Sequence, residues 1–168
     1  RLDLPAFPAS AAGPDLREVV LGSEGRLGVI TEGTVRVSPL PPREEVHGVF
    51  LPDLPTAVAA VRDLAAMRLP LSMLRLSTPE ETRTTLVLAG HERLVSALEK
   101  YLSFRGAREE KCLLLVGFSG SENLVRQARR QALGALAMRG GVAAGKAFGR
   151  EWTRNRFRAP YLRNALWE

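Results

Sequence analysis

The chain has 168 residues, of which 45% are apolar and 25% are charged. These values are close to the average of globular proteins, so they exclude a disordered or fibrous chain. No continuous apolar run reaches the length of about eighteen residues that a membrane-spanning helix needs. The net charge of +6 is uneven: residues 123–168 hold ten basic and two acidic groups, and residues 1–122 hold fourteen and sixteen.

The N-terminal part predicts little regular structure. Residues 1–18 are rich in proline, alanine and glycine and indicate an extended loop, in which Asp15 can cap a short helical turn. A glycine-rich segment at 22–28 follows. Residues 29–37 alternate between apolar and polar side chains, which predicts a half-buried strand. The three prolines within 39–42 end that strand and form a stiff hinge.

After the hinge, strand patterns alternate with helix patterns. We expect strands at 46–51, 72–77 and 111–118, and helices near 53–69, 78–81, 94–102, 122–136 and 148–152. Ser119 and Glu122 are expected to form a capping box for the fourth of these helices. This alternation of strands and helices predicts an α+β architecture, with one sheet covered by helices on one face.

Cysteine and histidine are too few for a Cys/His metal cluster, so no metal is expected. Cys112 begins the apolar run 112–116, which predicts a buried, unreactive thiol and fits a reducing, cytoplasmic compartment. His47 follows two glutamates on an expected strand edge, and His91 lies beside Gly90. Both are expected to be surface histidines rather than catalytic bases.

Arginines and aromatic side chains alternate in the basic C-terminal segment, as they do in nucleic-acid grooves. An anionic small molecule or a solvated helix face explains the same pattern, and no familiar nucleic-acid motif accompanies it. Nucleic acid is therefore the disfavoured partner, although a basic nucleic-acid-binding module stays an alternative. A steep loss of nucleic-acid affinity as salt is added would identify such a module.

The glycine-rich segment is ambiguous when taken alone. It contains three glycines in seven residues, Gly22-Ser23-Glu24-Gly25-Arg26-Leu27-Gly28. Glycine permits positive φ and close backbone approach, so amides in such a loop can face an anion or a ring system. Many hairpin loops have the same composition, and the pattern leaves both interpretations open.

A longer series of strings resembles the FAD-linked oxidases, which include vanillyl-alcohol oxidase, glycolate oxidase and D-lactate dehydrogenase. The series comprises Ala11-Ala12-Gly13-Pro14-Asp15-Leu16, Leu21 to Glu32, Val35-Arg36-Val37, Pro39-Leu40-Pro41, Ser72 to Leu76, Gly140-Gly141, Gly145, Trp152, Arg156-Phe157 and Pro160-Tyr161-Leu162-Arg163-Asn164-Ala165-Leu166. The strings at 13–15 and 160–163 are most similar to the alkyldihydroxyacetonephosphate synthase branch.

The resemblance implies two partial domains around one cofactor, FAD. Residues 1–43 would end a PCMH-type FAD-binding domain, and residues 44–168 would begin a ferredoxin-like cap (substrate) domain with an antiparallel sheet covered by helices. The residues implied to contact the flavin are Gly22, Ser23, Glu24, Gly25, Arg26, Leu27, Gly28, Val29 and Ile30. Arg26 departs from the family, which usually has threonine there. Backbone contact with the flavin would tolerate that change, whereas a hydrogen bond from the threonine hydroxyl to the flavin would be lost and the affinity for FAD would fall.

The resemblance also places Arg75 and Arg163 at the substrate. A guanidinium can grip a carboxylate or a phosphate with two hydrogen bonds, which suits a small anionic acid or phosphate ester. From the residues alone, Arg75 could instead lie on a solvated sheet face, and Arg163 could form a structural ion pair. Trp152 and Phe157 are expected in the core.

The family's pyrophosphate-binding loops and its catalytic tyrosine and histidines have no counterpart here. We therefore expect a fragment of a larger flavoenzyme that holds no catalytic residue and is inactive alone. The expected function is that of an FAD-dependent oxidoreductase similar to alkyldihydroxyacetonephosphate synthase. An FAD-dependent 2-hydroxyacid dehydrogenase, for glycolate or D-lactate, is the alternative, and a homodimer is a further expectation.

Overall fold

The structure, a computed structural model, describes residues 3–4, 12–88 and 92–155. The chain forms two compact units, residues 1–40 and residues 41–168. This boundary lies near the expected one after residue 43, and the assignment of the two parts to domains stays a prediction.

In the first unit the described residues form one short helix, α1 (Leu16–Val20). It begins where predicted, because Asp15 Oδ1 accepts a hydrogen bond from the Arg17 amide at 3.0 Å. The strand expected at 29–37 is wrong: these residues are irregular, and Val29 and Val37 are 88% and 82% exposed. A strand needs a neighbour to complete its hydrogen bonds, and the described part of this unit contains no strand that could pair with it.

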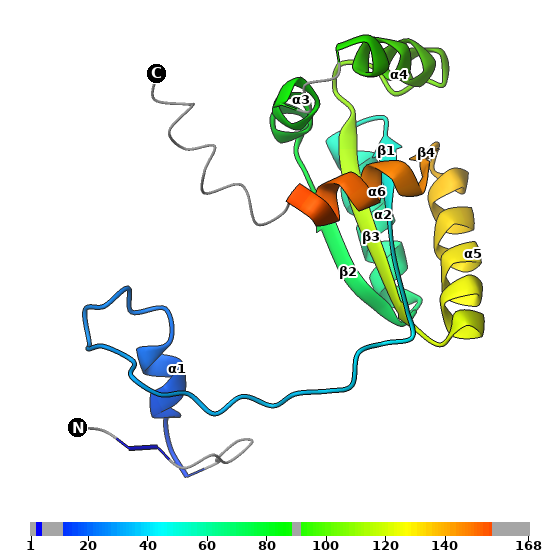
Figure 1. The fold of residues 1–168 in the computed structure, drawn as a ribbon. Helices are drawn as coiled ribbons and strands as arrows, with labels where there is room; N and C mark the ends of the chain where they lie inside the picture. Colours follow the sequence, from blue (N-terminus) through cyan, green and yellow to red (C-terminus); the bar gives the residue numbers. More distant parts are fainter. Residues whose placement is uncertain (1–2, 5–11, 89–91, 156–168) are drawn as a thin grey trace. The chain divides into compact units, whose positions relative to one another are not determined.

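The second unit is built on a four-stranded antiparallel sheet (Figure 1). Its strands are β1 (Arg43–Leu51), β2 (Leu71–Leu76), β3 (Cys112–Gly120) and β4 (Val142–Ala144), in the order β2-β3-β1-β4. With a helix after β1 and another after β3, this is the β-α-β-β-α-β order of ferredoxin-like folds. The predicted α+β class and antiparallel sheet are confirmed.

Within the described residues, five helices accompany the sheet. They are α2 (Leu54–Ala66), α3 (Pro79–Leu88), α4 (Glu92–Phe104), α5 (Glu122–Met138) and α6 (Gly145–Asn155). Asp53, at the predicted start of the helix, caps α2, since its Oδ1 accepts a hydrogen bond from the Thr56 amide at 2.8 Å. The cap of α5 is Ser121 rather than the predicted Ser119, because β3 continues to Gly120. None of the described helices has both the length and the apolar character needed to cross a bilayer.

Helices cover both faces of the sheet, so the expectation of a single covered face is wrong. One buried cluster joins α2 and α5 to Val49, Leu114 and Val116 of the sheet. A second cluster on the opposite face joins α3, α4 and α6 to Phe50 and Leu113. Figure 1 shows α6 crossing the sheet on one side and α2 on the other. The sheet residues are apolar in both phases of the alternation, which is the signal that two layers of helices are present.

Cys112 lies at the start of β3, a strand with a neighbour on each side. Its side chain is fully buried, as predicted, and burial raises the pKa of the thiol to about 11. The thiolate, which is the reactive form of cysteine, is therefore disfavoured in the folded chain.

Candidate functional site

The glycine-rich loop after α1 has the backbone that the sequence predicts. Gly22, Gly25 and Gly28 have φ values of +81°, +82° and +151°, which side-chain-bearing residues adopt only with strain. Nothing lies within 4 Å of the position that a Cβ would take at any of the three. The loop thus presents bare backbone that another molecule can approach closely.

The loop fits the planar ring of a flavin. Leu27 and Ile30 are 61% and 60% exposed, so they offer apolar surface beside the bare backbone. The Arg26 amide is used within the loop, since it donates to the Ser23 carbonyl at 3.0 Å. Flavin contact by residues 22–30 stays a prediction.

Arg75 is the candidate substrate-binding arginine that lies within the described residues, and it is on the edge strand β2. Its guanidinium forms an ion pair with Glu81 of α3, and its Cζ lies 5.9 Å from the centre of the Trp152 ring of α6. Leu74 and Leu76 pack against the other sheet face, as the alternation predicts. Arg75 is therefore held by two elements while about half of its side chain, 48%, stays exposed.

Arg163, the second candidate substrate arginine, lies outside the described residues, as do His91 and Phe157. Trp152 is half-buried and packs on the second cluster, which agrees with the expected core position. Within the described residues no cluster of three or more histidine, cysteine or acidic side chains could hold a metal ion.

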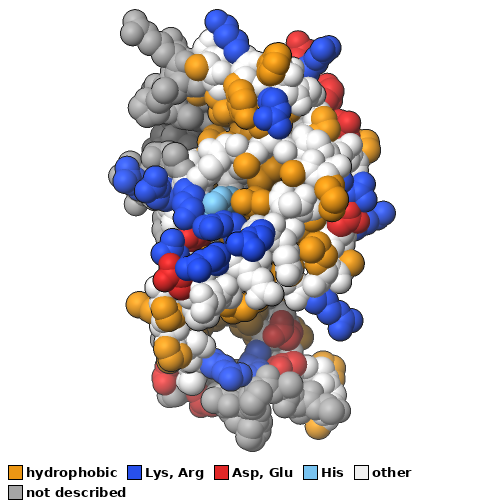
Figure 2. All heavy atoms as spheres, turned by 90° about the vertical axis from the view of Figure 1, so that its right-hand side faces the viewer, with side chains coloured by type: hydrophobic (Ala, Val, Ile, Leu, Met, Phe, Trp, Pro, Cys, Tyr) orange, Lys and Arg blue, Asp and Glu red, His pale blue; other side chains and the backbone are white. Residues whose placement is uncertain are grey.

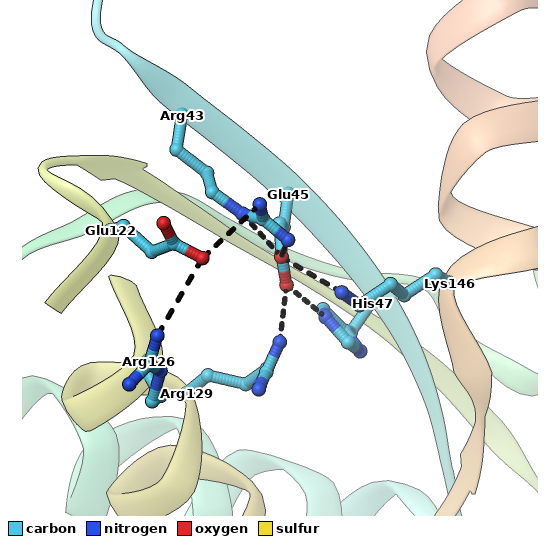
Figure 3. Close-up of polar contacts among 7 residues, drawn as sticks. All are labelled: Arg43, Glu45, His47, Glu122, Arg126, Arg129 and Lys146. Carbon is cyan, nitrogen blue, oxygen red and sulfur yellow. Dashed lines mark hydrogen bonds and ion pairs between the residues drawn. The ribbon is translucent and has the colours of Figure 1, made fainter. Parts of the chain in front are cut away.

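A group of charged residues that the sequence patterns did not predict surrounds Glu45 of β1 (Figure 3). Its Oε1 accepts hydrogen bonds from Arg43 Nη2 at 2.6 Å and from Lys146 Nζ at 2.8 Å. Its Oε2 lies 2.7 Å from Arg129 Nη1 and 3.1 Å from His47 Nε2. We call these five residues the Glu45 cluster. It joins β1 to α5 and α6, the helices that carry Arg129 and Lys146.

The electrostatics of the Glu45 cluster favour an ionised carboxylate. Burial alone would raise the pKa of Glu45, whose side chain is only 6% exposed. The hydrogen bonds from its four partners, led by those of Lys146 and His47, outweigh burial and hold the pKa well below its ordinary value of 4.5. Because a carboxylate only accepts, the ring nitrogen of His47 that faces it carries a proton.

His47 is 5% exposed, so the prediction of a surface histidine is wrong. Its strand, β1, lies between β3 and β4 rather than at an edge of the sheet. Its ring also meets that of Phe118 edge-on, with centroids 5.8 Å apart. His47 is thus held in the interior by polar and aromatic contacts together.

Comparison with known proteins places the chain in a family. The family described as FAD linked oxidases, C-terminal domain, matches residues 40–168. The chain belongs to the FAD-linked oxidases. This membership identifies FAD as the cofactor and confirms the resemblance inferred from the sequence.

Similar members of the FAD-linked oxidases include alkyldihydroxyacetonephosphate synthases. That of Dictyostelium discoideum is 30% identical over 98% of this chain and 28% of its own length, and that of Trypanosoma brucei brucei is 27% identical over 90% and 26%. A solved structure of an alkyldihydroxyacetonephosphate synthase superposes with a TM-score of 0.72 at 30% identity, over 93% of this chain and 29% of that one. The chain thus spans less than a third of the length of these relatives.

Proposed function

We propose that this chain supplies the flavin-contacting loop and part of the substrate domain of an FAD-dependent enzyme of the alkyldihydroxyacetonephosphate synthase type. The observation that carries this proposal is the similarity to such synthases, which runs through both units of the chain. A likeness confined to residues 41–168 would have supported the substrate domain alone. The substrate would be a small oxygenated anion. A cytoplasmic location and a homodimer belong to the same proposal.

The chain's own contribution would be to hold and orient. Residues 22–30 would contact the flavin through backbone atoms, because the glycines leave that backbone uncovered. Arg75 would grip a phosphate or carboxylate, while Glu81 and Trp152 restrict its movement. The electron chemistry would come from FAD when it is bound.

Dehydrogenation of a 2-hydroxyacid is a second candidate function. Its support is that an oxidoreductase is also among the relatives: a protein of Escherichia coli described as an uncharacterized FAD-linked oxidoreductase is 35% identical over a stretch that covers 44% of this chain. A carboxylate would suit Arg75 as well as a phosphate does. Anaerobic mixing of the full-length enzyme with glycolate or D-lactate separates the candidates, since only a dehydrogenase would lose its oxidised-flavin absorbance.

The loop assignment is tested by flavin content in the full-length protein. We expect Gly25→Val to abolish bound flavin, since valine covers the backbone and strains a residue at φ +82°. Gly33→Val is the matched control, because this nearby glycine has no positive φ and open space around it. Stoichiometric flavin in the Gly25 variant would contradict the assignment.

The substrate assignment is tested by steady-state kinetics. Arg75→Lys keeps the charge but loses the planar two-pronged geometry, and a charge-assisted hydrogen bond is worth about 1.5–3 kcal/mol. We expect kcat/KM to fall roughly tenfold to a hundredfold with the melting temperature unchanged. Arg163→Lys should behave alike, and Arg62→Lys, an exposed change on α2, should match the wild type. A parallel loss of stability and activity would instead make Arg75 a structural residue.

A further inference from the structure

An open hollow of about 700 Å³ lies between the start of β1 and α6, within the second unit. Its lining is strongly charged. Four basic side chains contribute to it, Arg43, Lys146, Arg150 and Arg154, together with two acidic ones, Glu44 and Glu45. On the face of the molecule shown in Figure 2, lysine and arginine side chains gather around a histidine.

The basic residues of α6 are arranged along one side of the helix. Lys146, Arg150 and Arg154 follow one another at intervals of four residues, so they lie on the same helix face. That face lines the hollow, and Arg43 of β1 reaches it from the sheet. Cations from two separate elements thus converge on one space.

Glu45 cannot neutralise these cations. Its Oε1 already accepts three hydrogen bonds, two from Arg43 and one from Lys146, and its Oε2 is close to Arg129 and His47. One buried carboxylate therefore faces three permanent cations. Arg43 and Lys146 have five and three donors respectively, so both keep donors for a further acceptor.

Arg150 adds a further positive charge to the lining of the hollow. No described residue forms an ion pair with it, and its side chain is exposed in the lining of the hollow. Arg43 also forms an ion pair with the exposed Glu122 at 3.6 Å, but the same Glu122 oxygen is shared with Arg126, again at 3.6 Å. Arg150 and the donors that Arg43 and Lys146 keep are therefore the groups that a further anion can meet in the hollow.

We propose that this hollow binds the phosphate group of a phosphate monoester. At neutral pH a phosphomonoester carries about −1.5 to −2 charges and three acceptor oxygens, so it can meet cations that converge from β1 and from α6, whereas a carboxylate offers one charge and two oxygens. Arginine binds phosphate through paired N–H donors, and lysine binds it as a point charge. The lining of the hollow includes neither Arg75 nor any residue of the glycine-rich loop, so the inference goes beyond the proposed function.

Calorimetric titration of the full chain with glycerol 3-phosphate and with inorganic phosphate tests the proposal. We expect saturable binding that weakens as salt is added, and no binding of glycerol. Arg150→Gln should weaken the binding of glycerol 3-phosphate about tenfold while the melting temperature is unchanged, since it removes a charge that the fold does not use. Arg62→Gln, the same change on α2 across the sheet, should bind as the wild type does.

Sedimentation with phosphatidylcholine vesicles, with and without phosphatidic acid, distinguishes the two sources of such a group. Binding of the soluble ester that depends on Arg150 assigns the site to a free metabolite. Binding only to vesicles that contain phosphatidic acid, again lost in Arg150→Gln, assigns it to a lipid headgroup. Absence of both, or an equal effect of Arg150→Gln and Arg62→Gln, would overturn the proposal. Neither assay involves FAD or turnover, so this result is independent of the proposed function.

Discussion

The two units of the chain use their apolar residues in opposite ways. In residues 12–40 the helix α1 buries none of its side chains, and Val29 and Leu40 are 88% and 92% exposed. In residues 41–155 the apolar residues of the sheet are enclosed from both sides, and Phe50 and Leu114 are fully buried. The difference teaches that apolar alternation specifies a strand only where a second layer and a neighbouring strand are present.

The largest expected effect concerns the core of the second unit. Phe50→Ala should lower the free energy of unfolding by about 3–5 kcal/mol, because it empties a filled site between the sheet and α6, where Phe50 meets Phe148 edge-on. Val29→Ala should change it by less than about 0.5 kcal/mol, since that side chain is exposed. Urea unfolding measures both. Similar losses in the two variants would show that the first unit has a core of its own.

The Glu45 cluster should give an intermediate effect. Glu45→Gln removes the charge that three cations and His47 contact, and we expect a loss of about 1.5–3 kcal/mol at pH 7. Glu44→Gln, at the exposed neighbouring position, should have almost none. Urea unfolding of the two variants side by side makes this comparison, and equal losses would mean that the cluster contributes no stability.

The same cluster predicts a pH dependence. The folded-state pKa of Glu45 lies below its ordinary value of 4.5, so its stabilising contribution is complete above that value and is lost as the pH falls toward the lowered pKa. Urea unfolding at pH 7 and at pH 3 should show a larger difference for the wild type than for Glu45→Gln. Identical differences would contradict the depressed pKa.

The smallest expected effect compares two helix caps of the same kind. Asp53 caps α2 and Asp15 caps α1, each through a bond to a backbone amide. Asp53→Ala should cost about 1 kcal/mol, because α2 packs into the core. Asp15→Ala should leave the thermal midpoint unchanged, since α1 buries nothing. A shift of the midpoint by the second change would show that α1 takes part in the cooperative transition.

Much of the second unit could be predicted from the sequence because its signals are local. The cap at Asp53, the helical spacing that follows it and the apolar run after Cys112 each place an element near its observed position. The strand predicted at 29–37 was wrong because its formation depends on residues outside the segment. Alternation reports which side chains could be buried, but a partner strand decides whether a strand forms. The second layer of helices could not be predicted in the same way, because the spacing within a helix does not say which face of the sheet the helix covers.

The Glu45 cluster was missed although a signal was present. Counting back by twos from Leu51 and Val49, which are buried, leads to His47 and Glu45 on the same face of β1. The period alone therefore predicts two buried polar side chains, and buried charge requires partners. Those partners could not be named, because Arg129 and Lys146 lie more than eighty residues away and only the sheet order brings them close.

The buried Cys112 is a built-in probe of how often the sheet opens. It is the single cysteine, so any thiol reagent that reacts must report on one position. Because its thiol is enclosed at the start of β3 and its pKa is raised to about 11, labelling must wait until the strand separates from its neighbours. The rate of labelling therefore measures how often the sheet opens, without an introduced probe.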